Sequence, residues 1–203
     1  NKGDDFFEFW SKNNFIVSLA SNLKTFSSKD FKNLIKRNKN TIFIIEHLAG
    51  VGNFEIKNKN LNKKDYDSLS EDEKVDLLTR ILDSKDTYSN QYELLPDEQK
   101  LVVDVFKTMI LLREQVSKEA FGHYIISMTH DASHVLEVMV LAKMAGLLGR
   151  TDDGGLFCDI LITPLFETID DLARIKNILE SLFSNDTYIK FLQCHQDNYK
   201  RLC

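Results

Sequence analysis

The chain has 203 residues, of which 43% are hydrophobic and 28% are charged, and its formal net charge is −5 at pH 7. This length suits one domain or a large part of one, and the composition supports a hydrophobic core and argues against disorder. The acidic balance argues against general nucleic-acid binding, and no apolar run reaches the roughly 18 residues that would span a bilayer. We therefore expect neither nucleic acid nor a membrane as a partner.

Glycine, proline and cysteine usage narrows the class further. Only 8 glycines and 2 prolines punctuate the chain, which favours a helix-rich architecture. The three cysteines, Cys158, Cys194 and Cys203, lack the paired spacing of zinc sites and disulfide frameworks, and no secretory signal is visible. We therefore predict reduced thiols and a cytoplasmic location. Because the chain starts at Asn1 and stops within a polar helical stretch, we also expect a piece of a longer protein.

Residues 1–118 predict a mainly helical segment. Apolar side chains recur at helical spacing over residues 4–26, and Ser28 is a suitable cap for a second helix. Residues 41–48 fit either a short strand or a buried helix, and the asparagine- and lysine-rich residues 50–65 indicate a loop.

The first turns of two further helices stand out in the same segment. Ser70 is followed by Glu73 at the spacing of a capping box, which predicts that a helix begins after the serine. Pro96 suits the first turn of a long helix, because an N–H at that position would have no helical partner. Phe121-Gly122 marks the expected end of that helix.

Residues 119–203 alternate between strand and helix patterns, which predicts a βαβα unit with parallel strands and a right-handed crossover. The expected elements are a strand over 124–128, a helix from Asp131 or Ser133 to Ala145 closed by Gly146, a strand over 158–163, and helices over 168–183 and 187–199.

The junction after the second of these strands carries the clearest functional signal. A β-branched apolar run stops at Pro164, and Glu167 follows three residues later, where the next helix begins. In α/β proteins, ligands and metals are held at the carboxyl ends of strands, so Glu167 is a candidate for chemistry. Asp170 and Asp171 lie in the first helical turn, where complementing the helix dipole is a simpler role than binding a metal.

Residues 119–199 resemble the phosphoenolpyruvate carboxylase family, in the part of its barrel that leads up to the metal site. The family shows Y-x-I-S-M, S-D-V-L, K-E-A-G, P-L-F-E-T-L-D-D-L and a later tyrosine in this order. Residues 69–85 also look like a family helix, and the first 60 residues match weakly. The corresponding residues here are Tyr124 to Met128, Ser133 to Leu136, Lys143 to Gly146, Pro164 to Leu172, and Tyr188.

The resemblance implies a predominantly helical α/β fold, a partial TIM-type (β/α) barrel with additional helices, with residues 119–203 as an incomplete part of the catalytic barrel. It implies a carboxy-lyase that forms oxaloacetate and phosphate from phosphoenolpyruvate and bicarbonate, an anaplerotic step of carbon dioxide fixation that feeds the tricarboxylic acid cycle. Mg²⁺ or Mn²⁺ would be the cofactor, Glu167 a metal ligand, and the whole protein a cytoplasmic homotetramer. No catalytic residue is assigned within this chain, which alone we expect to be inactive.

Two departures from the family pattern leave alternatives open. The acidic residues of S-D and K-E are replaced by His134 and Met144, and the family's second metal carboxylate lies in a G-Y-S-D-S-x-K-D segment that this chain lacks. The chain could therefore belong to a non-catalytic scaffold of the same family, or to another magnesium-dependent barrel enzyme that acts on an enolate.

The histidines and one cysteine have simpler explanations than metal binding. His130 and His134 have a spacing that could bind zinc on a helix, but no third ligand is evident and His130 is expected in a loop at the mouth of the site. His123 and His195 are expected to be packing or surface residues, and Cys158 a small core residue.

Overall fold

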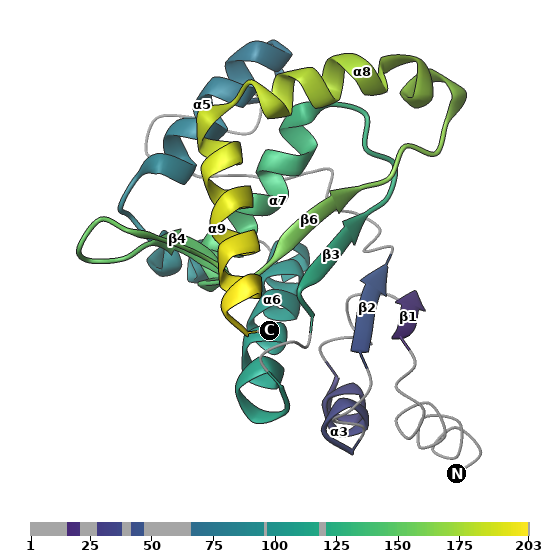
Figure 1. The fold of residues 1–203 in the computed structure, drawn as a ribbon, viewed down its shortest axis with the longest axis vertical. Helices are drawn as coiled ribbons and strands as arrows, with labels where there is room; N and C mark the ends of the chain where they lie inside the picture. The colour runs from purple at the N-terminus through teal and green to yellow at the C-terminus, as the bar shows by residue number, and fades with distance from the viewer. Residues whose placement is uncertain are drawn as a thin grey trace.

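The computed structural model describes residues 16–20, 28–37, 42–46, 66–95, 97–117 and 121–202 (Figure 1). In chain order the elements are β1 (Ile16–Ala20), α3 (Lys29–Arg37), β2 (Ile42–Glu46), α5 (Glu71–Asp83), the 3-10 helix η1 (Ser89–Leu94), α6 (Asp97–Gln115), β3 (His123–Ile126), α7 (Ala132–Ala145), β4 (Leu148–Arg150), β5 (Leu156–Cys158), β6 (Leu161–Pro164), α8 (Ile169–Phe183) and α9 (Asp186–Leu202).

Four strands form a parallel sheet in the order β1-β2-β3-β6. In the β3–β6 pair, Tyr124 lies opposite Ile162 and Ile126 lies opposite Pro164. Because every pairing is parallel, the carboxyl ends of these strands face the same edge of the sheet, as the arrowheads of β3 and β6 show in Figure 1. The described residues therefore form a mainly helical α/β fold.

The predicted βαβ unit is confirmed, with one insertion. β3, α7 and β6 follow one another with parallel strands, but the antiparallel hairpin of β4 and β5 lies between α7 and β6. The strand predicted over 158–163 is consequently divided: Cys158 ends the hairpin, and β6 begins at Leu161 after the chain has turned towards the main sheet.

The N-terminal predictions need one clear correction. The helix predicted over residues 4–26 is wrong for residues 16–20, which form β1 and pair with β2, because strand pairing with a distant segment overrides the local helical period. The rest of that range, residues 50–65 and Pro96 lie outside the described residues. The ambiguous segment at residues 41–48 contains the strand β2, and α6 ends at Gln115, before the predicted stop.

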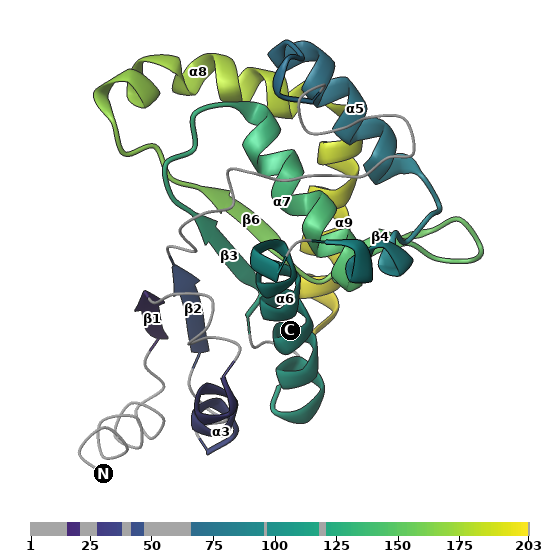
Figure 2. The same cartoon turned by 180° about the vertical axis from the view of Figure 1, so that it is seen from behind.

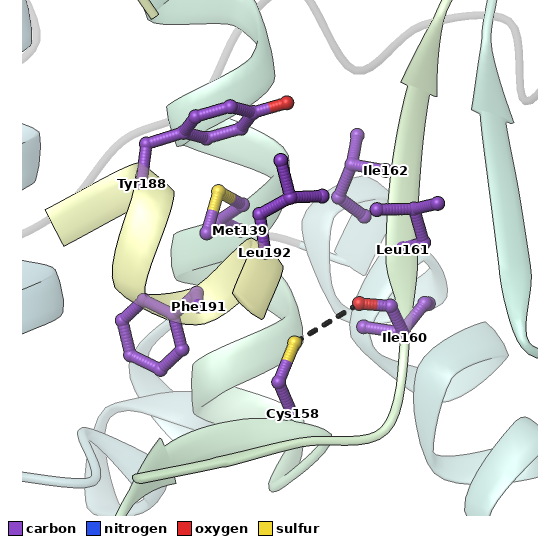
Figure 3. A pocket seen from close by; sticks show the side chains of 8 residues that line it. All are labelled: Met139, Cys158, Ile160, Leu161, Ile162, Tyr188, Phe191 and Leu192. Carbon is purple, nitrogen blue, oxygen red and sulfur yellow. Dashed lines mark hydrogen bonds between the residues drawn. The ribbon is translucent and has the colours of Figure 1, made fainter. Parts of the chain in front are cut away.

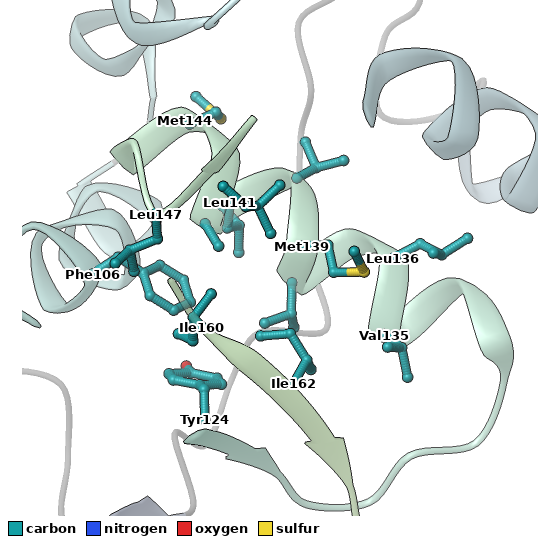
Figure 4. Packing of buried hydrophobic residues seen from close by; sticks show 14 of the residues in the cluster. Phe106, Tyr124, Val135, Leu136, Met139, Leu141, Met144, Leu147, Ile160 and Ile162 are labelled. Carbon is teal, nitrogen blue, oxygen red and sulfur yellow. The ribbon is translucent and has the colours of Figure 1, made fainter. Parts of the chain in front are cut away.

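The core is centred on α7, which is apolar on every side and buried along almost its whole length. Figure 2 shows α7 lying across β3 and β6, with α5 on its far side. α6 contacts α7, and α9 contacts α5, α8 and β5. In the close view of Figure 4, side chains of α6, α7, β3 and β6 meet, among them Phe106, Tyr124, Met139 and Ile162, and Ile160, just before β6, joins them. Each fully buried aliphatic side chain of this kind contributes about 1.5–3 kcal/mol.

Helix ends follow their sequence signals. The Ser70 hydroxyl accepts a hydrogen bond from the Glu73 N–H, and the Glu73 carboxylate accepts one from the Ser70 N–H, which confirms the predicted capping box. Ser28 likewise accepts a hydrogen bond from the Phe31 N–H. Gly146 follows α7 with φ of 92°, a backbone conformation that glycine adopts without strain. Within the described ranges, none of the helices combines the length and the apolar character needed to cross a bilayer.

Candidate functional site

The candidate site lies where β3 and β6 end. The chain leaving β3 runs beside the chain leaving β6 (Figure 1), and backbone hydrogen bonds join the two segments. The Leu165 N–H donates to the Ile126 carbonyl at 2.8 Å, and the Thr129 N–H donates to the Leu165 carbonyl at 3.0 Å. The ladder between the strands therefore continues into the two loops and fixes their relative position.

Glu167 is exposed at this edge, and its carboxylate is held by the neighbouring loop. The Met128 N–H, just after β3, donates to Glu167 Oε2 at 2.8 Å. From the described residues, Glu167 Oε1 receives no hydrogen bond. The carboxylate thus faces the ends of two neighbouring strands, with one oxygen oriented by the backbone and the other open to a ligand.

Met128 adopts a left-handed backbone conformation, with φ of 54°, and the residue is 47% exposed. In a residue other than glycine this conformation costs roughly 1–2 kcal/mol, so the conformation persists only where surrounding contacts hold it. The hydrogen bond from its N–H to Glu167 is one such constraint.

Asp171 is fully buried and accepts hydrogen bonds from three residues. Its Oδ1 lies 2.6 Å from His130 Nδ1 and 3.1 Å from Arg174 Nη2, and its Oδ2 accepts from the Thr168 N–H at 3.3 Å. Thr168 and Asp171 form a capping box at the start of α8, which confirms the prediction that Asp171 serves the helix start. The hydrogen bonds from Thr168 and His130 lower the pKa of Asp171 to about 2, so the carboxylate is ionised at neutral pH.

The start of α7 is held by residues that local sequence spacing did not reveal. Asp131 occupies the capping position but its side chain makes no capping hydrogen bond. Instead, the carboxylate of Glu71, at the start of α5, accepts from the N–H and the hydroxyl of Ser133, both at 2.8 Å. Glu71 and Ser133 are 62 residues apart, so only the packing of α5 on α7 brings them together.

His134 stands where the family pattern has an acidic residue, and it accepts a hydrogen bond there. Its Nδ1 accepts from the His130 N–H at 3.4 Å, and burial lowers its pKa, which favours the neutral ring. The two rings are 5.8 Å apart between centroids. Among the described residues there is no group of three or more histidine, cysteine, aspartate or glutamate side chains that could hold a metal.

Met144, the second departure, is buried in the core beside Lys143. The Lys143 ammonium donates to three carbonyls at the end of α5, those of Ile81, Leu82 and Ser84, at 2.6, 3.1 and 2.5 Å. A cation at a helix C-terminus satisfies carbonyls that lack helical partners. Burial lowers the pKa of Lys143 to about 8. Lys143 therefore joins α7 to the end of α5, and Met144 is part of the hydrophobic core.

A second candidate location, an apolar pocket between β6, α7 and α9, belongs to the core (Figure 3). Cys158 and Tyr188 lie on its wall, and the Cys158 thiol donates to the Ile160 carbonyl. Cys158 is buried, which confirms it as a core residue, and burial raises the pKa of its thiol to about 12. His195 is also buried, and its ring contacts that of the exposed His123 edge-on.

The site contains one carboxylate, Glu167, that is suitably placed for a divalent cation. A magnesium ion commonly keeps several waters and takes only one or two protein carboxylates together with substrate oxygens. The open Oε1 and the exposed position of Glu167 fit one such contribution. The described residues do not supply a complete ligand set.

Comparisons with known proteins agree with the motifs. The family profile described as Phosphoenolpyruvate carboxylase matches residues 54–200, well over half of the chain. The phosphoenolpyruvate carboxylase of Aliivibrio salmonicida is 42% identical over 135 residues, which is 65% of this chain and 14% of that protein. Those of Prochlorococcus marinus strains MIT 9312 and CCMP1986 are 36% and 34% identical over 143 and 145 residues, which is 68% of this chain and 14% of each protein.

The chain thus spans about 14% of the length of the curated relatives that it matches. The match covers the βαβα unit and the edge that carries Glu167. The chain belongs to the phosphoenolpyruvate carboxylase family.

Proposed function

We propose that this chain contributes one metal ligand and one side of the active site to a phosphoenolpyruvate carboxylase. The reaction converts phosphoenolpyruvate and bicarbonate into oxaloacetate and inorganic phosphate. The observation that carries the proposal is the position of Glu167: its carboxylate lies at the carboxyl ends of β3 and β6, with Oε2 held by the Met128 N–H and Oε1 open. Membership of the phosphoenolpyruvate carboxylase family supports this role for Glu167.

Glu167 would bind Mg²⁺ or Mn²⁺ through the oxygen that the loop leaves open. When bound, the cation supplies Lewis acidity to the enolate oxygen and the phosphate of the substrate. The Met128 N–H orients the carboxylate, and the hydrogen-bonded loops limit its movement. Further ligands would come from water, the substrate and residues other than those described.

The sheet supports the proposal of a (β/α) barrel. Its strands are parallel, and their order in the sheet follows their order in the chain, as in a barrel. β1 pairs with β2, and β2 pairs with β3, so strands from both sides of the proposed division lie in one sheet. We propose that residues 1–118 are a helix-rich part and residues 119–203 a βαβα part of one barrel. We also propose a cytoplasmic homotetramer as the working protein, as the family resemblance implies.

The proposal is tested by a chimera. The aligned segment of the Aliivibrio salmonicida relative is replaced by the matching segment of this chain, and oxaloacetate formation is measured with phosphoenolpyruvate, bicarbonate and Mg²⁺. We expect an active chimera, and a loss of at least a hundredfold on Glu167→Gln. The isolated 203-residue chain, assayed in parallel, should form no oxaloacetate.

A folded, tetrameric but inactive chimera would favour the non-catalytic scaffold instead. Consumption of phosphoenolpyruvate to a product other than oxaloacetate would favour a different enolate chemistry. Both departures from the family pattern have a place in the fold, because His134 accepts a hydrogen bond from the His130 N–H and Met144 is buried in the core.

A further inference from the structure

The loop after β3 is fixed at three successive backbone N–H groups. That of Met128 donates to Glu167 Oε2 at 2.8 Å, and that of Thr129 donates to the Leu165 carbonyl at 3.0 Å. That of His130 donates to His134 Nδ1 at 3.4 Å. Two of these three acceptors belong to the segment between β6 and α8, so the conformation of the loop and the position of Glu167 depend on each other.

The side chain of His130 adds a contact between the same loop and the start of α8. Its Nδ1 lies 2.6 Å from Oδ1 of the buried Asp171. Asp171 is ionised and can only accept, because its pKa is about 2, so the proton of this hydrogen bond lies on His130 Nδ1. His134 Nδ1 accepts a hydrogen bond from the His130 N–H, so it carries no proton, and the proton of the neutral His134 ring lies on Nε2.

We propose that His130 is a positioning residue for Glu167: its bond to Asp171 holds the β3–α7 loop against the start of α8, so that the Met128 N–H stays on the Glu167 carboxylate. The inference rests on the proposed function of Glu167 as a metal ligand. Its physical basis is the strained backbone of Met128, with φ of 54°. Once the His130 ring is removed, Met128 relaxes towards an extended conformation and its N–H turns away from Glu167.

The choice of variant follows from the contacts. Asp171 also caps α8 and binds Arg174, so its substitution would disturb the helix as well as the loop. The His130 side chain is 39% exposed, and its truncation leaves the apolar core intact. His130→Ala removes the donor, whereas His130→Asn retains an N–H donor close to the position of Nδ1. His123→Ala is the matched control, since His123 is an exposed histidine at the opposite end of β3.

The test uses the 203-residue chain, and its first measurement is the hydrogen exchange of the Met128 amide by NMR. We expect His130→Ala to accelerate this exchange roughly tenfold or more, because a charge-assisted hydrogen bond is lost. His130→Asn should restore most of the protection, and His123→Ala should change nothing. An unchanged Met128 amide in His130→Ala, with the fold retained by circular dichroism, would overturn the proposal.

The second measurement uses Mn²⁺ alone as a probe and follows the paramagnetic broadening of the amide signals around residues 128 and 167. We expect His130→Ala to weaken this binding several-fold and His130→Asn to recover it. Equal broadening in the unsubstituted chain, His130→Ala and His130→Asn would overturn the positioning role of His130. Glu167→Gln separates the two proposals: if it leaves the broadening unchanged, the metal-ligand role of Glu167 fails, while the dependence of the Met128 amide on His130 can still be observed.

Discussion

The two ends of the β3–β6 pair have opposite characters. At the amino end the Leu161 N–H donates to the Gly122 carbonyl, and Ile160 and Cys158 beside it are buried. At the carboxyl end Met128 and Glu167 are exposed, and the loops are held by contacts of four polar side chains, those of Glu167, His130, His134 and Asp171. The same two strands therefore run from a packed core into a polar edge.

This difference suggests that the amino end of the strand pair stabilises the fold and that the carboxyl end binds ligands. In α/β folds the carboxyl ends of parallel strands carry ligand sites, whereas the amino ends chiefly stabilise the fold. Substitutions at the amino end should therefore change the free energy of unfolding, and substitutions of the exposed residues at the carboxyl end should change ligand binding with little effect on that free energy.

The largest stability effect is expected from Lys143, which lies in the last turn of α7, towards the amino end of the strands. Lys143→Met should reduce the free energy of unfolding by about 3 kcal/mol, because three carbonyls at the end of α5 lose their donor. Urea unfolding measures the change. Lys176→Met is the control, since the Lys176 side chain is 81% exposed, and should shift the value by less than about 0.5 kcal/mol. Equal effects of the two substitutions would show that the buried ammonium has no special role.

A smaller effect of opposite sign is expected at Tyr124. Its hydroxyl is buried and has no hydrogen-bond partner among the described residues, while its ring packs on Phe106 at 4.7 Å between centroids. Tyr124→Phe should raise the free energy of unfolding by about 1 kcal/mol, because an unsatisfied buried hydroxyl is removed and the ring contact remains. A loss of stability in the same urea experiment would mean that the hydroxyl has a partner.

The smallest of these effects is a pH dependence of the free energy of unfolding, to which one histidine at each end of the strand pair contributes. Burial lowers the pKa of His134 at the carboxyl end and of His195 at the amino end. Each neutral ring therefore contributes stability that is present above the unfolded-state pKa of about 6.5 and is lost as pH falls through the lower folded-state value. Urea unfolding at decreasing pH should show this loss, and His134→Asn and His195→Asn should each remove part of it. A flat profile below pH 6.5 would contradict both assignments.

Local signals in the sequence predicted much of the fold. Ser70 and Gly146 marked their helix ends correctly, and the junction at Pro164 placed Glu167 at the end of a strand. These features depend on residues within a few positions of one another. The strand β1 escaped prediction because its apolar spacing is compatible with a helix, and its pairing with β2 is a tertiary effect.

The supporting contacts of the site could not be predicted from the sequence. Glu71 and Ser133 are 62 residues apart, and His130 and Asp171 are 41 apart. No periodicity or spacing rule joins such pairs, because they meet only after α5 packs on α7 and β6 pairs with β3. The sequence could therefore indicate Glu167 as a candidate ligand, but not the residues that hold its carboxylate in place.

The most direct test of the central claim is the affinity of the active chimera for Mn²⁺, measured with and without Glu167→Gln alongside the free energy of unfolding. One charge is lost with little change in volume at an exposed position, so stability should change by less than about 0.5 kcal/mol. The account predicts that Mn²⁺ affinity falls at least tenfold and that activity falls with it. Unchanged Mn²⁺ affinity and turnover in the Glu167→Gln protein would contradict the account.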